Sequence, residues 1–360
     1  MLRSLSARRA LPLAALVSAS LLIAGCGGSG GGSSKATDSP SATPSATIAA
    51  SVIPKNPCDI KSGTTSGAVK VTGKLGKPVQ ASFTAPMNAT DLQRTILDPA
   101  TGKTVAPGAK VPGLGRLTAR GDKLNLVTTL YLGSDGKVAP GSGGAKISAV
   151  KGQLRVGDPS LPAVYVAGSA CVPVGSRIVT TVPARDVLGA SGNADLGVKP
   201  ENALIFVTDV VSIEKQLTPK KWVGAPKVTF RGAQVPKVAL VKGKGSKDLL
   251  LDVIKAGKGA KVLAGDTVTV DYAGFNQRTG KVFDSSYKRG TPASFPTDGV
   301  VQGFAAALIG QRAGTQLIVS IPAKYGYESA GSPQAGIKGT DTIVFVIEIR
   351  STAPTTAPAN

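Results

Sequence analysis

Apolar and polar residues alternate along the last third of the chain, as they do in half-buried strands. Residues 265–275 read GDTVTVDYAGF, and shorter stretches of the same kind follow at 282–284, 315–322 and 342–349. Between them, VVQGFAAALIG at 300–310 has apolar residues at helical spacing and ends at a glycine. The pattern predicts an α+β fold in which an antiparallel sheet curls around one short helix.

Five segments of this region have a specific order and spacing, namely VDYAG, KVFDSS, VVQGFAAALIGQRAG, IPAKYGY and TIVFVIEI. Several segments in one order are a far more specific signal than a single short motif. On these residues the chain resembles the FKBP-type peptidyl-prolyl cis-trans isomerases, across about the whole of one family domain. The resemblance implies an isomerase that acts on prolyl bonds and uses neither a cofactor nor a metal.

The resemblance also assigns the residues of the site. The catalytic positions fall on Tyr272, Phe283, Asp284 and Tyr327. The substrate pocket falls on Phe295, Val300, Val301, Phe304 and Phe345, with Phe304 at the floor.

Three positions depart from the family pattern. The floor residue is usually tryptophan and here is Phe304, and an aromatic residue often found two positions before Phe295 is replaced by Ala293. Glu328 stands where the family has a glycine after the loop tyrosine. We expect these changes to affect the turnover rate and the affinity for macrolides more than the fold.

Prolyl isomerisation needs no nucleophile. Rotation about an X-Pro bond crosses a barrier of about 18–20 kcal/mol, because twisting the amide sacrifices its resonance. No bond breaks, so a catalyst needs a water-poor pocket that favours the twisted imide over the planar one. Aromatic side chains would supply that pocket, and Asp284 and the Tyr327 hydroxyl would orient substrate carbonyls. The alternative is that these aromatic residues are only part of a core.

Composition narrows the chemistry further. The 360-residue chain contains no histidine, which excludes histidine-based proteolysis, histidine metal sites and histidine acid–base catalysis. Its three cysteines are too few for a zinc site made of cysteine alone. At this length we expect about two or three domains.

The first residues have the pattern of an export signal. Arginines precede an apolar run at 11–23, and small residues then lead to Cys26. The run is too short to span a bilayer comfortably. We therefore predict that residues 1–25 are a lipoprotein signal peptide and that Cys26 becomes the lipidated N-terminus, as in secreted actinobacterial lipoproteins. The alternative is ordinary cleavage nearby that leaves Cys26 as a free thiol. The protein would then be anchored by lipid on the extracytoplasmic face of the cell membrane.

Two stretches lack the apolar residues that a core requires. Residues 26–57 consist mainly of Gly, Ser, Thr, Ala and Pro, and residues 352–360 have the same character. Such compositions cannot repay the conformational entropy that folding costs. We predict a disordered tether and a disordered tail.

Residues 58–217 contain a second version of the strand pattern. GDKLNLVTTLYLGSDGKVAP aligns with GDTVTVDYAGFNQRTGKVFD, VGSRIVTTVPARDVLG with AGTQLIVSIPAKYGYE, and ENALIFVTDVVS with TDTIVFVIEIRS. Such self-similarity indicates a duplication. We predict two FKBP-like domains, a degenerate one at 58–217 and an isomerase at 261–351. The alternative is a chance similarity between unrelated strands.

The alignment removes most of the pocket from the first domain. The positions of Tyr272, Phe283, Asp284 and Tyr327 are occupied by Thr128, Ala139, Pro140 and Leu188, whereas Phe345 corresponds to Phe206. We expect the first domain to be a binding or structural module.

Cys58 and Cys171 remain once Cys26 is assigned to lipid. Both would be exported, and an even number of cysteines in an oxidising compartment favours a disulfide. Such a bond would close a long loop. Two unpaired thiols are the alternative.

Positive charge is concentrated between the two predicted domains. The formal net charge is +21, and residues 218–260 contain ten basic but only two acidic side chains. We predict a lysine-rich linker ending in a strand that leads into the next sheet. Such a segment favours an anionic surface of the cell envelope, such as lipid headgroups, although a solvated face is the alternative. Nucleic acid is not an expected partner, because no aromatic motif interleaves with these lysines.

Together these features predict a membrane-anchored foldase that isomerises prolyl bonds in exported, proline-containing polypeptides. One alternative is a non-catalytic chaperone or peptide-binding module on the same fold, which Ala293, Phe304 and the degenerate first domain favour. A solute-binding lipoprotein is a third possibility, but it would need two lobes with many helices, and this sequence is rich in strands.

Overall fold

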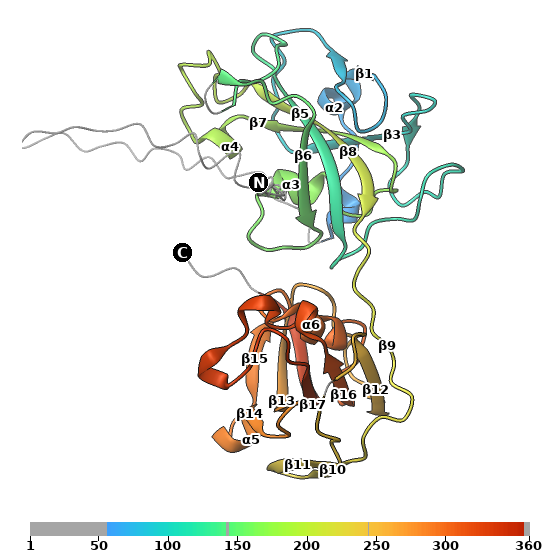
Figure 1. The fold of residues 1–360 in the computed structure, drawn as a ribbon. Helices are drawn as coiled ribbons and strands as arrows, with labels where there is room; N and C mark the ends of the chain where they lie inside the picture. The colour runs from blue at the N-terminus through green and yellow to red at the C-terminus, as the bar shows by residue number, and fades with distance from the viewer. Residues whose placement is uncertain (1–55, 142–143, 244, 356–360) are drawn as a thin grey trace, which may run out of the picture. The chain divides into compact units, whose positions relative to one another are not determined.

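A computed structural model describes residues 56–141, 144–243 and 245–355. The chain divides between Ile213 and Glu214 into a first and a second compact unit (Figure 1). The predicted signal peptide, Cys26 and almost all of the predicted tether lie outside the described residues. Within the described part of the chain, no helix is long and apolar enough to cross a membrane.

The second unit is built on a seven-stranded sheet with the order β14-β13-β17-β16-β12-β9, and β15 also pairs with β13. Its strands are β9 (Lys220–Lys221), β12 (Leu250–Lys255), β13 (Asp266–Asn276), β14 (Val282–Ser285), β15 (Ala293–Pro296), β16 (Gln316–Ile321) and β17 (Ile343–Pro354). All neighbours are antiparallel except β9 and β12. β17 continues through residues 352–354, which the sequence had assigned to the disordered tail, because they pair with the start of β13.

The inner face of this sheet packs against one short helix, α6 (Gln302–Leu308). Successive strand residues point to opposite faces, so Val268, Val270 and Tyr272 of β13 enter the inner core. Ala273 and Phe275 belong to the outer face. The predicted antiparallel sheet around a short helix is therefore present in this unit. A single-turn helix, α5 (Ser286–Arg289), follows β14, and three short 3-10 turns, η3 (Ala323–Tyr325), η4 (Glu328–Ala330) and η5 (Pro333–Ala335), lie between β16 and β17.

The outer face of the sheet is covered by a hairpin of β10 (Val228–Arg231) and β11 (Gln234–Val238). Phe230 and Val235 pack onto a cluster that includes Phe275 of the sheet. Arg231 and Lys237 of the hairpin, and Lys227 directly before it, alternate with these apolar residues and are exposed. The described residues of the segment 218–260, predicted to be a linker plus one strand, are thus a folded part of the second unit, because apolar residues between 222 and 240 cover the sheet.

The first unit has a six-stranded antiparallel sheet with the order β4-β3-β7-β8-β5-β6. Its helices are η1 (Pro57–Asp59), α2 (Thr64–Ala68), α3 (Ala163–Ala167) and α4 (Arg185–Leu188). Its strands are β1 (Lys70–Thr72), β2 (Gln80–Ser82), β3 (Gln93–Leu97), β4 (Thr104–Val105), β5 (Lys123–Leu132), β6 (Val150–Arg155), β7 (Arg177–Pro183) and β8 (Ala203–Ile213).

The two units repeat one strand order. The path β3-β7-β8-β5 in the first unit corresponds to β12-β16-β17-β13 in the second, with the same antiparallel pairing. A short helix precedes β7 and β16 alike, and the β1–β2 hairpin packs on the outer face of the first sheet as β10–β11 does on the second. The repeat therefore includes the hairpin before each sheet as well as the sheet itself.

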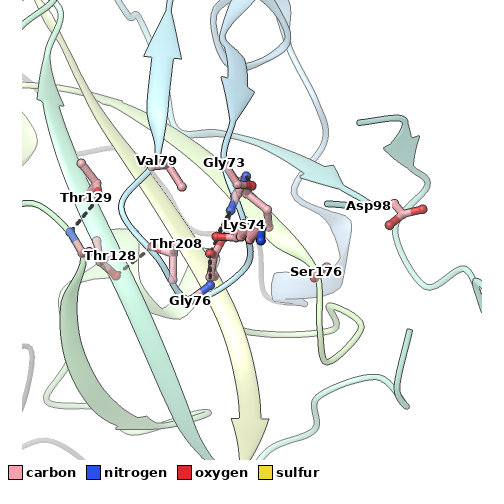
Figure 2. Close-up of polar contacts among 12 residues, drawn as sticks. Gly73, Lys74, Gly76, Val79, Asp98, Thr128, Thr129, Ser176 and Thr208 are labelled. Carbon is pink, nitrogen blue, oxygen red and sulfur yellow. Dashed lines mark hydrogen bonds and ion pairs between the residues drawn. The ribbon is translucent and has the colours of Figure 1, made fainter. Parts of the chain in front are cut away.

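A buried ion pair fastens the β1–β2 hairpin of the first unit. The Nε and Nη2 atoms of Arg177 donate to Asp209 at 2.7 and 3.0 Å, and both side chains are 2% exposed. Arg177 also donates to the Gly73 carbonyl at 3.0 Å, while the backbone N–H of Gly76 donates to Asp209. Arg177 donates to the Lys74 carbonyl as well, and Figure 2 shows Gly73, Lys74 and Gly76 beside the sheet, with dashed lines for hydrogen bonds. The pair joins the hairpin turn to β7 and β8.

Cys58 and Cys171 form a disulfide, with their Cα atoms 5.2 Å apart. Beside it lies Arg94, whose guanidinium is buried and donates to the carbonyls of Ala167 and Ala170 at the end of α3. Arg94 also donates to the Cys58 carbonyl. Burial lowers the pKa of Arg94 to about 10. A positive charge at the C-terminus of a helix is favourable. Through its hydrogen bonds to Ala167 and to Cys58, Arg94 links the end of α3 to the start of the first unit.

Candidate functional site

Five aromatic side chains from five elements meet on the inner face of the second sheet. They are Tyr272 of β13, Phe283 of β14, Phe295 of β15, Phe304 of α6 and Phe345 of β17. The ring centroids of Phe304 and Phe345 are 4.9 Å apart, and each lies 6.0 Å from that of Tyr272. The structure thus brings together five of the six aromatic residues that the sequence assigned to the site, all except Tyr327. We call them the aromatic cluster.

The aromatic cluster has a buried part and a part that solvent reaches. Tyr272, Phe304 and Phe345 are buried, whereas Phe283 and Phe295 are half-buried. Phe283 meets Phe345 edge to face, and Phe295 meets Phe304 in the same way. Such T-shaped contacts stabilise aromatic packing beyond the burial of area. A bound peptide could therefore reach Phe283 and Phe295 directly, with the other three rings behind them.

Gly274 makes room for this packing. A Cβ atom at this position would lie 2.7 Å from the ring of Phe283 and 2.7 Å from that of Phe345. Real Cβ contacts are not that short, so a side chain here would push the two rings away from β13. The glycine in VDYAG therefore lets Phe283 and Phe345 close over the strand.

A polar network borders the aromatic cluster. The Tyr272 hydroxyl donates to Oδ2 of Asp284, and Nη1 of Arg289 donates to Oδ1 of the same carboxylate. Nη2 of Arg289 donates to the Tyr272 hydroxyl at 2.9 Å, and the guanidinium lies 5.5 Å from the centroid of the Tyr272 ring. Ser285 caps α5, and Gly290 ends it in a left-handed conformation. This single helical turn places the Arg289 side chain beside Asp284.

The pKa values of Tyr272 and Asp284 are shifted in opposite directions. Burial raises the pKa of Tyr272 to about 12, and its hydrogen bond to Asp284 contributes in the same direction. Burial would also raise the pKa of Asp284, but hydrogen bonds from Tyr272 and Arg289 lower it overall. At neutral pH the tyrosine is therefore a hydrogen-bond donor and the aspartate an anion.

Tyr327 reaches the site from the loop between β16 and β17. It is half-buried against the inner core. Burial raises the pKa of Tyr327, and the negative charge of Asp284 raises it further. No partner for the Tyr327 hydroxyl is found among the described residues. The phenol is therefore protonated at neutral pH and available to donate to a bound molecule.

The other predicted pocket residues lie beside the aromatic cluster. Val300 and Val301 are half-buried against the same core, where the chain enters α6, and Val301 is the N-cap residue. Ala293 is half-buried at the start of β15. Glu328 is exposed and has a φ of 50°, a left-handed conformation that costs less for glycine. The sequence analysis missed one residue of the site, Arg289. It lies five residues after Asp284 in DSSYKRG, a spacing that one helical turn can bridge.

A cavity of about 650 Å³ lies elsewhere in the second unit. Its lining comes from Gly245, Ser246, Lys247, Pro322, Ala323, Lys324, Glu328, Ser329, Gly339, Thr340 and Thr342. None of these residues belongs to the aromatic cluster.

The corresponding region of the first unit is filled. Thr128 stands opposite Thr208 on the neighbouring strand, as Tyr272 stands opposite Ile347, and the two threonine hydroxyls are hydrogen-bonded at 3.1 Å. Tyr165 of α3 packs against Phe206 with ring centroids 5.7 Å apart. The space left beside these side chains is about 10 Å³, which suffices for about one water molecule.

Comparison with known proteins identifies the family. A family model described as FKBP-type peptidyl-prolyl cis-trans isomerase matches residues 258–350. Over 118 residues the chain is 36% identical to the probable FK506-binding protein of Corynebacterium glutamicum, and the alignment covers 32% of this chain and 97% of that protein. The chain belongs to the FKBP-type peptidyl-prolyl cis-trans isomerase family. Its FKBP-type region contains the whole aromatic cluster.

Other relatives are longer than the matched region. FkpA of Escherichia coli is 39% identical over 120 residues, which is 33% of this chain and 43% of FkpA. A protein of Legionella longbeachae named outer membrane protein MIP is 42% identical over 101 residues, 28% of this chain and 42% of its own length. This chain therefore spans less than half of these two FKBP-type relatives.

Proposed function

We propose that the second unit catalyses cis-trans isomerisation of prolyl bonds in polypeptides. The observation that carries the proposal is the aromatic cluster bordered by Asp284 and by the Tyr327 hydroxyl. The chain belongs to an enzyme family with this activity, and the family model covers every residue of this arrangement.

The half-buried rings of Phe283 and Phe295 would receive the proline ring, with Phe304 beneath it. The planar imide has the larger charge separation and is therefore the more strongly hydrated form. In this apolar site it loses hydrogen bonds to water that the protein does not replace, which raises its free energy. The twisted imide has less charge separation and loses less, so the barrier between the isomers falls. No proton transfer and no covalent step is required.

The polar groups would hold the peptide while its bond turns. The Tyr327 phenol would donate to a carbonyl oxygen of the substrate. Asp284, ionised and held by Arg289, would face peptide N–H groups or the partial positive charge of the imide carbon. Because both groups are fixed before the peptide binds, they cost no reorganisation during the rotation.

We further propose that the protein is exported and anchored by lipid at Cys26, so that its clients are exported polypeptides. The signal-like sequence of residues 1–25 supports this location, as does the name of the Legionella relative, which refers to the outer membrane. The exposed basic residues of the β10–β11 hairpin would then face anionic groups of the envelope.

The first unit would be a diverged copy without isomerase activity. Its strand order matches that of the second unit, but Thr128 and Thr208 bond to each other where the second unit has Tyr272. With its pocket filled by Tyr165 and Phe206, the first unit would serve as a structural or binding module.

A second candidate function is a chaperone that binds proline-containing segments without accelerating their isomerisation. Ala293 favours it, because the small side chain leaves one wall of the site without an aromatic ring. Phe304 favours it as well, because phenylalanine provides a smaller floor than tryptophan.

An isomerisation assay on the full chain tests the proposal. We expect the protein to accelerate isomerisation of a proline tetrapeptide, and we expect Phe283→Ala to lower kcat/KM by about ten-fold, equivalent to about 1.4 kcal/mol of transition-state stabilisation. Phe83→Ala in the first unit removes a similar half-buried ring and should leave kcat/KM unchanged.

The outcomes separate the two candidate functions. Peptide binding without acceleration would replace the isomerase with the chaperone. An equal loss of activity in both variants would remove the aromatic cluster from the mechanism.

A further inference from the structure

Asp341 is a buried carboxylate at the end of the loop that carries Tyr327. Arg278 donates to it twice, from Nε at 2.8 Å and from Nη2 at 2.9 Å. Nδ2 of Asn276 donates at 2.7 Å, and the backbone N–H of Lys338 donates at 2.9 Å. Four hydrogen bonds therefore converge on one residue that is 5% exposed.

These bonds join parts of the chain that lie far apart in sequence. Asn276 ends β13, and Arg278 belongs to the turn before β14, whereas Asp341 and Lys338 belong to the loop before β17. The bidentate bond from Arg278 and the other donors hold the pKa of Asp341 well below its usual range, although burial opposes this effect. The carboxylate is therefore an anion in the folded protein. We call Asn276, Arg278 and Asp341 the loop clamp.

A continuous set of backbone contacts leads from the loop clamp to Tyr327. The backbone groups of Ser332 and Ile337 exchange two hydrogen bonds, of 2.8 and 3.0 Å, directly before Lys338. On the other side of Ser332, the N–H of Gly331 donates to the Tyr327 carbonyl at 3.1 Å. The loop segment between Tyr327 and Asp341 is thus held by backbone hydrogen bonds within the loop and by the loop clamp at its end.

Gly339 adds a close packing contact to this path. A Cβ atom at this position would lie 2.1 Å from the carbonyl oxygen of Ser329. The backbone next to Asp341 therefore rests directly on the backbone two residues after Tyr327. A displacement at Gly339 would be passed to η4 and so to Tyr327.

We infer that the loop clamp is a positioning group for Tyr327. The loop between β16 and β17 contains only short 3-10 turns, so little regular structure fixes it. By tying the end of the loop to the β13–β14 turn, Asp341 holds the Tyr327 phenol beside the aromatic cluster before the peptide binds. This lowers the ordering cost of reaching the reactive geometry. The inference rests on the role proposed for Tyr327.

A double-mutant cycle in the full chain tests the inference. The variants are Asp341→Asn, Tyr327→Phe and the double variant, and the measurement is kcat/KM for a proline tetrapeptide. We expect Asp341→Asn to lower kcat/KM by about ten-fold. In the Tyr327→Phe background we expect Asp341→Asn to add less than about two-fold, because the phenol that it positions is already absent.

A matched control separates positioning from general stability. Asp266 is also a buried carboxylate of β13 and accepts hydrogen bonds from the Leu263 N–H and the Thr352 hydroxyl. Asp266→Asn should destabilise the unit without lowering kcat/KM at a temperature where it remains folded. If Asp341→Asn does not fold, Arg278→Gln replaces it, since the Arg278 side chain is 41% exposed.

Each outcome decides the inference. Additive effects of Asp341→Asn and Tyr327→Phe, or unchanged kcat/KM in Asp341→Asn and Arg278→Gln, overturn it. An unchanged kcat/KM in Tyr327→Phe overturns the role proposed for Tyr327, and the inference with it. If acceleration by the unaltered protein is absent, the isomerase proposal itself fails, which is a different result from any failure of the loop clamp.

Discussion

Asp284 keeps its charge although it is half-buried. Loss of hydration alone would raise the pKa of the carboxyl group, but the hydrogen bonds from Tyr272 and Arg289 reverse the direction of the shift. The pKa of Asp284 in the folded protein lies below its value in the unfolded chain. The ionised network therefore contributes to the free energy of unfolding at pH values above the unfolded pKa. That contribution is lost as the pH falls through the folded pKa.

We expect Arg289→Gln to move the acid limb of kcat/KM to higher pH. The substitution removes a charged donor from Asp284, so burial is less strongly opposed and the pKa of the carboxyl group rises. The measurement is the pH profile of kcat/KM with a proline tetrapeptide. Lys288→Gln, at an exposed neighbouring position of α5, should leave the profile unchanged. Identical acid limbs in Arg289→Gln and the unaltered protein would show that this pair does not set the charge of Asp284.

Among the elements, the β10–β11 hairpin combines two roles on its two faces. Val228 and Phe230 contact the outer face of the sheet, while Thr229 and Arg231 of the same strand are exposed. Lys237 stands opposite Thr229 on β11, and Lys227 directly precedes β10. The sequence showed the excess of lysine but not its arrangement. Period-two alternation separates these charges from the apolar positions, so one segment both covers the sheet and presents cations to solvent.

We expect the exposed face of this hairpin to bind anionic lipid surfaces. The test is co-sedimentation of a soluble form beginning at residue 27 with vesicles of phosphatidylcholine that contain phosphatidylglycerol. Lys227→Glu with Lys237→Glu should weaken binding by at least about ten-fold at low salt, since each basic residue near such a surface contributes roughly 1 kcal/mol.

The matched control is Lys103→Glu with Lys110→Glu, which changes the net charge by the same amount at exposed positions of the first unit. Equal weakening in both variants would mean that net charge alone attracts the protein to the vesicles. Binding that does not decrease with added salt would also contradict an electrostatic surface.

In the molecule as a whole, each unit has its own sheet and its own core. The disulfide belongs to the first unit alone, where it joins residues 113 positions apart. The candidate site belongs to the second unit alone. Stability of the first unit and activity of the second should therefore respond to different substitutions.

We expect Cys58→Ser with Cys171→Ser to destabilise only the first unit. Loss of a native disulfide typically costs about 2–5 kcal/mol, because the unfolded chain gains freedom. Thermal unfolding of the full chain should show one transition at lower temperature, while kcat/KM at 25 °C stays unchanged. Phe283→Ala should instead lower kcat/KM and leave the unfolding transition of the first unit unchanged. A loss of activity in the cysteine variant would show that the units depend on one another.

The sequence by itself determined four strands of the second sheet, the short helix and the aromatic residues of the site. Alternation, helical spacing and the glycines are properties of neighbouring residues, so they can be recognised without knowing the fold. The family resemblance then placed Tyr272, Phe283, Phe295, Phe304 and Phe345 in one pocket, and the structure brings these rings into contact. The repeated pattern likewise predicted a shared sheet, and the two units have the same strand order.

The tertiary structure alone decided the contacts between distant parts of the chain. Asn276 and Asp341 are 65 residues apart, and no periodic pattern links an asparagine in one turn to an aspartate in another. The pairing of Cys58 with Cys171 was one of two open alternatives. The covering role of residues 218–260 was hidden by their lysines. In each case the deciding factor is which surfaces the folded sheet brings together, and the free energy of that packing depends on residues far away in sequence.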